Sequence, residues 1–363
     1  MKKLVTFGEI MGRLAPEQFY RFSQSCPGRL DLTFAGAEAN VAASVAMLGG
    51  ESAFVTALPK HAIADGCIRT LKSVGVDTQY ILRTDDGRLG LYFVETGANQ
   101  RPSNVVYDRT GAAVSLTPAE AYDWDAVFAD AGWFHISGIT PSLSRCAADA
   151  SLTAVKKAKS SGVMVSCDLN FRKKLWKWDE RLAPRELAEK TMRNLLPFVD
   201  VVIGNEGDAE DVLGIRAGAS DVEAGQLAID KYPDVARQIA AQFPNVGKVA
   251  ITLRESISAS HNNWGAMLYD SGRGEAVFAP MKQGQYCPYE IRNIVDRVGG
   301  GDSFAAGLIF ALSSDEYAAD SDAIAFAVAA SCLAHSIKGD FNLSSRAEVD
   351  VLMRGSGSGR VVR

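Results

Sequence analysis

The chain has few of the residues that build metal sites and disulfide frameworks. Its six cysteines are widely spaced without a Cys-x-x-Cys pair, and its four histidines are equally dispersed. A structural zinc site and a disulfide-rich fold are therefore both disfavoured, and scattered cysteines suggest reduced thiols. The most apolar runs fall well short of the roughly 20 residues that span a bilayer, and the N-terminal apolar stretch is too short for a signal peptide. We expect a cytoplasmic protein without a membrane partner.

The chain also lacks an excess of positive charge. It carries 38 Lys and Arg against 43 Asp and Glu, a net charge of -5, and has no basic block. Nucleic acid is therefore a poor candidate partner, and a small molecule fits better. There is no GxxxxGK[ST] loop, no HRD or DFG set and no GxSxG motif, which disfavours other nucleotide-kinase designs and serine hydrolases.

What the chain does contain is a regular alternation of two kinds of segment. Its 363 residues, 47% of them hydrophobic, are enough for a substantial core. Short β-branched and aromatic runs predict strands at 4–7, 53–56, 133–136, 163–166, 199–203 and 248–252, and Ala-rich stretches predict helices at 38–48, 142–161, 186–196 and 235–243. This order predicts an α/β fold around a mostly parallel sheet buried on both faces.

Other stretches break this rhythm. Residues 13–34 and 89–113 carry aromatics and turn residues without a clear helix, so we expect them to pair as a small β-sheet lid. Residues 216–230 are rich in small residues and predict a surface excursion. We expect one domain over 1–350 and a flexible tail over 351–363.

The segment Asp296-Arg297-Val298-Gly299-Gly300-Gly301-Asp302 is the most informative motif. Glycines let the backbone approach a ligand closely, and a helix N-terminus offers unpaired N–H groups to a phosphate. Asp302, at the junction of loop and helix, could accept a proton from an attacking hydroxyl. Asp is also a favoured helix cap, so the segment alone leaves a structural role open.

Polar residues follow three of the predicted strands. They are Asp168-Leu169-Asn170-Phe171-Arg172, Gly204-Asn205-Glu206-Gly207-Asp208 and Leu253-Arg254-Glu255. Each could be an ordinary polar strand end. In a doubly wound sheet, however, ligands bind beyond the carboxyl ends of the strands, so these residues would converge with the glycine loop on one crevice.

Together these motifs resemble those of the ribokinase-like (PfkB) carbohydrate kinases. The resemblance runs from Gly8 to about Asn342. The family signature Asp-Thr-x-Gly-Ala-Gly-Asp stands here as residues 296–302, with Arg297 in place of Thr and Gly300 in place of Ala. The signature Gly-Gly-x-x-x-Asn-x-Ala stands as residues 35–42, with Ala35 in place of the first Gly. The resemblance implies a three-layer α/β/α fold with a β-sheet lid, and use of ATP and Mg²⁺.

The resemblance also implies roles for individual residues. Asp302 would be the catalytic base, and the backbone of Gly299, Gly300 and Gly301 would bind the transferring phosphoryl group. Asp208, where the family has Glu, would support Mg²⁺ through water. The sugar would meet Gly36, Asn40 and Asp340, and the nucleotide would meet Asn170, Asn205, Thr252, Arg254 and Glu255.

Two further stretches, 106–109 and 168–176, resemble the 2-keto-3-deoxygluconate kinases within this family. Such a substrate is a sugar acid, and an arginine fork matches its carboxylate. We expect Arg109, Arg172 and the Tyr107 hydroxyl to hold it, with Tyr92 nearby, and ATP to phosphorylate its 6-hydroxyl. Without the resemblance, the two arginines would be taken as solvated surface charges.

Three alternatives remain open at this point. The chain could phosphorylate fructose, another ketose or a nucleoside on the same fold. It could be a non-catalytic sugar-binding regulator, or a Rossmann dehydrogenase, although its glycine cluster lies far from the first strand. In the family the lid often forms a dimer interface, so a homo-oligomer through the β lid is expected.

Overall fold

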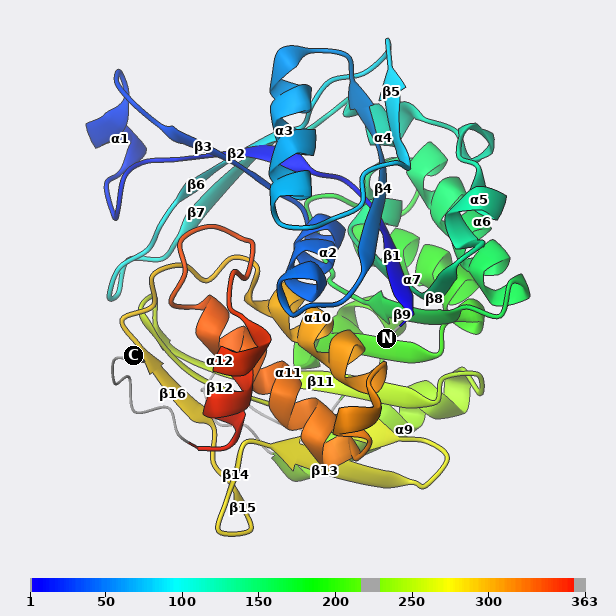
Figure 1. Cartoon of the computed structure of the whole chain (residues 1–363), viewed down its shortest axis with the longest axis vertical. Helices are drawn as coiled ribbons and strands as arrows, with labels where there is room; N and C mark the ends of the chain where they lie inside the picture. The colour runs from blue at the N-terminus through cyan, green and yellow to red at the C-terminus, as the bar shows by residue number, and fades with distance from the viewer. Residues whose placement is uncertain (1, 217–228, 356–363) are drawn as a thin grey trace.

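The computed structural model describes residues 2–216 and 229–355, and its centre is a ten-stranded sheet (Figure 1). The strand order is β13-β12-β11-β10-β9-β8-β1-β4-β5, with β16 paired to β12. The strands are β1 (Lys3–Phe7), β4 (Ser52–Pro59), β5 (Ile81–Thr84), β8 (Ala131–Ser137), β9 (Met164–Asp168), β10 (Val201–Asn205), β11 (Lys248–Ser258), β12 (His261–Asp270), β13 (Glu275–Ala279) and β16 (Tyr289–Arg292). Neighbours from β5 to β11 run parallel, whereas β12 is antiparallel to β11, β13 and β16.

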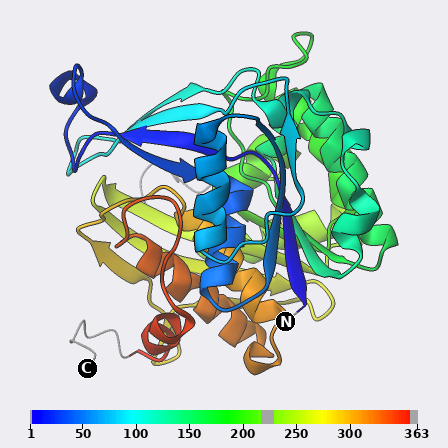
Figure 2. The same ribbon diagram turned by 45° about the horizontal axis from the view of Figure 1, so that its top comes forward.

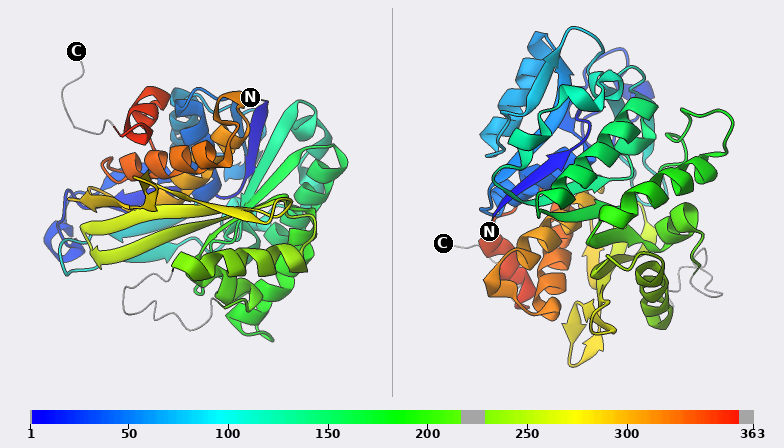
Figure 3. Two further views of the ribbon diagram at one scale, coloured as in Figure 1. Left: turned by 90° about the horizontal axis from the view of Figure 1, so that it is seen from below. Right: turned by 90° about the vertical axis from the view of Figure 1, so that its right-hand side faces the viewer.

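Helices cover both faces of this sheet (Figure 3). One layer holds α2 (Ala37–Met47), α3 (Ala62–Ser73), α10 (Gly300–Leu312), α11 (Asp320–Ala334) and α12 (Arg346–Met353). The other holds α4 (Ala113–Leu116), α5 (Trp124–Phe128), α6 (Arg145–Ser160), α7 (Pro184–Leu195), α8 (Glu206–Leu213) and α9 (Tyr232–Gln242). Single 3-10 turns lie at Ala119–Ala121, Thr140–Ser142, Leu196–Phe198, Ile229–Lys231 and Asp315–Tyr317.

The central strands are apolar throughout because both of their faces are covered. All eight residues of β4 are buried. In β1, Leu4 packs into the cluster with α10 and α11, while Val5 and Phe7 pack into the cluster with α6. Since successive side chains of a strand point to opposite faces, one short strand supplies both cores. The predicted three-layer α/β fold is confirmed.

A separate four-stranded sheet lies beside this body (Figures 1 and 2). Its order is β3-β2-β6-β7, with β2 (Met11–Ala15), β3 (Asp31–Ala35), β6 (Leu91–Glu95) and β7 (Asn104–Asp108). The short helix α1 (Phe22–Ser25) connects β2 to β3. We call these four strands the accessory sheet. They come from the two stretches, 13–34 and 89–113, in which the α/β rhythm is broken.

The end of the chain is helical for longer than the sequence predicts. The helix α12 runs to Met353, so the tail cannot begin at residue 351; its capping box between Ser345 and Glu348 sets its start. The rest of that tail, from 356, and residues 217–228 of the excursion predicted over 216–230 lie outside the described residues. A small hairpin, β14 (Met281–Lys282) and β15 (Gln285–Tyr286), completes the strands. Within the described part, no helix combines the length and apolarity needed to cross a membrane.

Candidate active site

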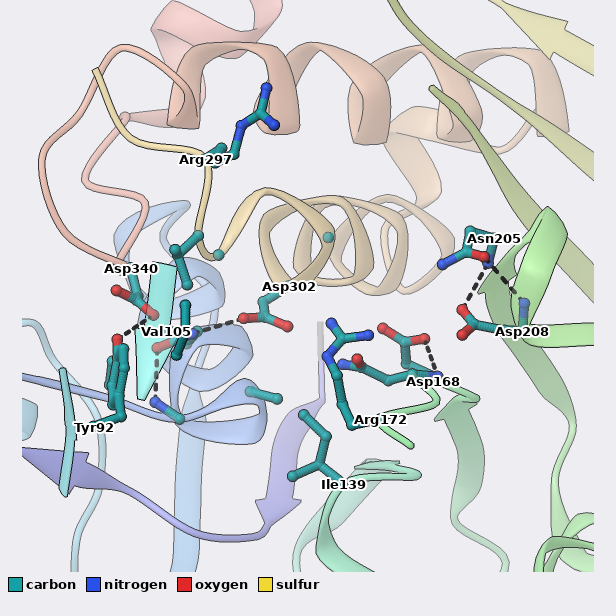
Figure 4. A pocket seen from close by; sticks show the side chains of 18 of the residues that line it. Tyr92, Val105, Ile139, Asp168, Arg172, Asn205, Asp208, Arg297, Asp302 and Asp340 are labelled. Carbon is teal, nitrogen blue, oxygen red and sulfur yellow. Dashed lines mark hydrogen bonds between the residues drawn. The ribbon is translucent and has the colours of Figure 1, made fainter. Parts of the chain in front are cut away.

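A cleft of about 400 Å³ lies at the carboxyl ends of the parallel strands, bordered by the accessory sheet (Figure 4). It brings together most of the residues singled out from sequence: Gly36, Asn40, Tyr92, Tyr107, Arg109, Asn170, Arg172, Asn205, Asp208, Thr252, Arg254, Gly299, Gly301, Asp302 and Asp340. Because β1, β9, β10 and β11 are neighbours or near neighbours in one sheet, residues at their ends meet at one edge.

Asp302 occupies the middle of this cleft (Figure 4). It is the third residue of α10, which starts directly after Gly299. Gly299 has φ of 85°, and a Cβ there would lie 2.3 Å from the Asp340 carbonyl oxygen, so only glycine fits. Asp302 is partly exposed to the cleft, yet desolvation by the surrounding protein raises its pKa to about 7. A carboxyl group with that pKa can exchange a proton near neutral pH.

The two glycine signatures meet at this carboxylate. Asn40 accepts a hydrogen bond from the Gly36 N–H at 3.1 Å and donates one to Asp302 Oδ2 at 2.6 Å. A Cβ at Gly36 would lie 1.9 Å from the Glu9 carbonyl oxygen, so glycine allows α2 to start against the end of β1. Ala35 is the buried last residue of β3 and is not among the described residues with positive φ, so its replacement of glycine introduces no strain.

Two predicted site residues do not line the cleft. Glu255 accepts a hydrogen bond from Asn263 Nδ2 at 2.7 Å and lies outside the cleft lining, so its role in binding nucleotide stays a prediction. The reason is that β11 continues to Ser258, and alternation then puts Thr252 and Arg254 on the cleft face and Glu255 on the other. The α-carbon of Gly300 faces the His335 ring, so a role in phosphate binding is left to its backbone N–H alone.

Three carboxyl groups lie in the middle of the cleft and on its side away from Tyr92: Asp302, Asp168 and Asp208 (Figure 4). Burial raises the pKa of Asp168 and of Asp208, and the charges of Asp208 and Asp302 raise that of Asp168 further. Asp208 is also structural. Its carboxylate accepts hydrogen bonds from the backbone N–H groups of Phe171 and Asn205, at 2.9 and 3.0 Å.

These acids are suited to a bound cation, but not to direct chelation. Across residues 2–216 and 229–355, no three His, Cys, Asp or Glu side chains are grouped to hold a metal ion. Mutually destabilised carboxylates gain from a nearby cation, and Mg²⁺ keeps several waters when protein ligands are few. The residues present therefore fit an ion that is held through water.

The cleft is lined by two guanidinium groups in different situations, Arg109 at the accessory sheet and Arg172 in the loop after β9. Arg109 donates from Nε and Nη2 to Glu9 Oε2, the first at 2.7 Å, and lies 5.4 Å from the centre of the Tyr107 ring. It is therefore already paired with a carboxylate that the sequence did not reveal. Arg172, in contrast, donates to the Phe171 carbonyl oxygen, and among the described residues it makes no ion pair within 4 Å. Figure 4 shows its guanidinium between Asp302 and Asp168.

Some residues of the site were missed from sequence. Glu9 lines the cleft, and Arg13 forms a buried ion pair with Asp296 beside it. Asp168 also lines the cleft; the sequence placed it at the crevice without giving it a role. Glu9 follows the end of β1, a signal that could have found it. Arg13 lies within a short strand and shows no local signal.

Arg297, which stands where the family signature has Thr, donates hydrogen bonds to the Ser258 carbonyl oxygen and to Asn262 Oδ1, both at 3.0 Å. It therefore ties the glycine loop to the β11–β12 hairpin.

A comparison with known proteins identifies the family to which this arrangement belongs. Residues 1–345 match the pfkB family carbohydrate kinase description. The chain belongs to the pfkB family of carbohydrate kinases. The dehydrogenase alternative is therefore wrong, and the carbohydrate-kinase prediction is confirmed.

Individual relatives show which members of the family the chain is similar to. A 2-dehydro-3-deoxygalactonokinase of Haloferax volcanii is 30% identical over 357 residues, 98% of either chain. The crystal structure of a 2-dehydro-3-deoxygluconokinase from Thermotoga maritima has a TM-score of 0.87 and 42% identity, over 98% of this chain and 100% of that one. Fructokinase-2 of Solanum lycopersicum is 27% identical over 313 residues, 86% of this chain and 82% of that protein.

Proposed function

We propose that this carbohydrate kinase transfers the γ-phosphoryl group of ATP to the 6-hydroxyl of 2-keto-3-deoxygluconate or a close stereoisomer. The observation that carries the proposal is Arg172, a cleft guanidinium without an ion-pair partner in the described part, beside the carboxylate of Asp302. A sugar acid can bring a carboxylate into direct contact with this guanidinium, and a neutral sugar cannot. The two relatives named for sugar-acid substrates support the same class.

The cleft has two ends with different chemistry. One side is formed by the accessory sheet with the residue after β3 and by the 339–342 loop, and we assign it to the sugar acid; it is lined by Gly36, Tyr92, Tyr107, Arg109 and Asp340. The other side is lined by Asn170, Asn205, Thr252, Arg254 and Asp208, which we assign to ATP and to Mg²⁺ held through water. Asp302 lies between the two ends, where the acceptor hydroxyl and the γ-phosphoryl group would meet.

Asp302 then has a definite task. Oδ2 is held by Asn40, so Oδ1 is free to take the proton of the acceptor hydroxyl as the bond to phosphorus forms. The backbone N–H groups at the start of α10 lack carbonyl partners within the helix and stabilise charge on the transferring group. The metal, when bound, neutralises charge on the nucleotide phosphates. The accessory sheet, acting as a lid, excludes water and so favours transfer over hydrolysis.

Replacing Arg172 tests the substrate class. Arg172→Met should lower kcat/KM for the sugar acid about 10²-fold, because the carboxylate loses a charged hydrogen-bonding partner, and should change that for fructose by less than about threefold. Lys173→Met removes an exposed cation from the same loop and serves as the control. Arg109→Ala is a poorer test, since it would also leave the buried Glu9 without its ion-pair partner.

Equal losses on both sugars would reject the carboxylate role of Arg172. That result would favour the second candidate, a fructose kinase, which the resemblance to the tomato fructokinase supports. A non-catalytic regulator is disfavoured because Asp302 keeps both the position and the pKa that a general base needs.

The accessory sheet also favours self-association. Its registers place Leu32, Leu14, Phe93 and Val106 in one row across β3, β2, β6 and β7. The outer members of this row, Leu32 and Val106, are 46% and 49% exposed, whereas the row on the opposite face includes Arg13 and Tyr92 and is turned to the cleft side. We infer that the apolar row packs against a second copy of the chain.

A further inference from the structure

Arg13 joins the accessory sheet to the catalytic loop through charge. It lies in β2, and its side chain is only 3% exposed. One terminal nitrogen, Nη2, donates to Asp296 Oδ2, and the other, Nη1, donates to Asp340 Oδ1. Asp296 lies three residues before Gly299, and Asp340 lies in the loop after α11. A single guanidinium therefore bridges carboxylates from two separate parts of the chain.

The same two carboxylates organise the backbone around the anion-binding loop. Asp296 accepts hydrogen bonds from the N–H groups of Val298 and Gly339, each at 3.2 Å. Asp340 accepts one from the Tyr92 hydroxyl of β6 at 2.8 Å, and its carbonyl oxygen lies against the α-carbon of Gly299. Movement of either carboxylate would therefore shift the loop that leads into α10.

The charge balance of this cluster depends on Arg13. Burial raises the pKa of Asp340, and the neighbouring Asp296 raises it further, whereas Arg13 lowers it. Without the guanidinium, two buried carboxylates would face each other with hydrogen bonds from neutral donors alone. Breaking a buried ion pair by removing one partner is costly because the remaining charge has no compensation. Here the uncompensated charge would lie beside the side of the cleft that we assign to the sugar acid.

We propose that Arg13 is a positioning residue for phosphoryl transfer: a built-in cation that holds Asp340 charged and oriented toward the sugar and fixes the accessory sheet to the glycine loop. The proposal rests on the kinase function proposed above but not on the identity of the sugar. It concerns the sugar end of the cleft, so Arg13 should affect the KM for sugar and leave that for ATP nearly unchanged.

Chemical rescue tests this proposal. Arg13→Ala removes the side chain and leaves a space between two carboxylates that a free guanidinium ion fits. With the sugar that the wild type phosphorylates best, kcat/KM should fall about 10²-fold, the loss expected for a misplaced binding group. Guanidinium chloride at low, non-denaturing concentration should restore activity at least about fivefold, and an equal concentration of sodium chloride should not. Arg88→Ala removes an exposed arginine paired with Asp108 in the accessory sheet, and should show neither effect.

The outcomes separate positioning from general structural support. A lower kcat with both KM values unchanged and no rescue would mean only a smaller folded fraction, and would overturn the proposal, as would near-normal activity. If Arg13→Ala does not fold, Arg13→Lys should fold and show a raised sugar KM, because an ammonium group cannot span both carboxylates in the same way. If the wild type phosphorylates no sugar, the proposed function fails. The role of Arg13 is then tested by thermal unfolding: guanidinium should raise the Tm of Arg13→Ala more than that of the wild type. Equal Tm shifts would reject the role of Arg13 as a cation between Asp296 and Asp340.

Discussion

Asp302 shows how one residue acquires its chemistry from its surroundings. An aspartate in water is ionised at neutral pH and is a weak base. Burial in the cleft and the charges of Asp340 and Glu38 raise the pKa of Asp302, while Asn40 and Arg172 lower it, and the balance is about 7. This value is close to the one that best serves a general base at neutral pH.

The pH dependence of the reaction should report this group. Since the base must be unprotonated, kcat/KM should rise about tenfold per pH unit below about 7 and become level above it. The measurement is a pH-rate profile with saturating ATP and limiting sugar. A profile that is level from pH 5 to pH 8 would contradict the assignment.

Asp302→Asn should separate activity from stability. Turnover should fall about 10²- to 10⁴-fold, the range expected for loss of a general base. The folded-state pKa is raised, so wild-type stability falls as the pH rises from the ordinary value near 4 through about 7. The variant lacks this loss. Its Tm advantage over the wild type should therefore be larger at pH 8 than at pH 5, and a constant difference would argue against a raised pKa.

At the level of elements, the two glycines Gly299 and Gly301 at the start of α10 differ in whether the fold leaves room for a side chain. Gly299 has positive φ and lies against Asp340, whereas a methyl group on Gly301 would meet nothing within 4 Å. Gly301 lines the cleft, so a methyl group there would occupy space that we assign to the transferring phosphoryl group. The fold requires glycine at 299, and we propose that the ligand requires it at 301.

Alanine at these two positions should give different failures. Gly301→Ala should keep or raise the Tm, because alanine favours a helix, and should lower kcat/KM at least about tenfold. Gly299→Ala should lower both the Tm and the activity. Thermal unfolding and ADP release measure the two effects, and an active Gly301→Ala enzyme would mean that this part of the helix does not contact phosphate.

The elements also show what could be predicted from sequence. Buried strands and Ala-rich helices were found because their patterns are local, and so was the glycine loop. The position of Glu255 outside the cleft lining could not be predicted, because nothing in the sequence marks the extension of β11 to Ser258. The links from Arg13 to Asp296 and Asp340 span 283 and 327 residues, a separation at which no local pattern indicates contact. The pairing of Arg109 with Glu9 was missed for the same reason.

At the scale of the whole molecule, the accessory sheet has two faces of different chemistry. One contributes Tyr92 and Tyr107 to the cleft, and the other presents the apolar row that includes Leu32 and Val106. If the row is a dimer interface, the double variant Leu32→Glu/Val106→Glu should be monomeric in light scattering at a concentration at which the wild type is dimeric. A monomeric wild type would rule out this interface.

A panel of sugars, tested with the wild-type enzyme, decides whether the chain is a sugar-acid kinase. ADP release with ATP and Mg²⁺ should give a kcat/KM for 2-keto-3-deoxygluconate, or its galactonate isomer, at least about 10²-fold above that for fructose, ribose or a nucleoside. Phosphorus NMR should place the phosphate on the 6-oxygen. A kcat/KM for fructose equal to or above that for the sugar acids would contradict the account.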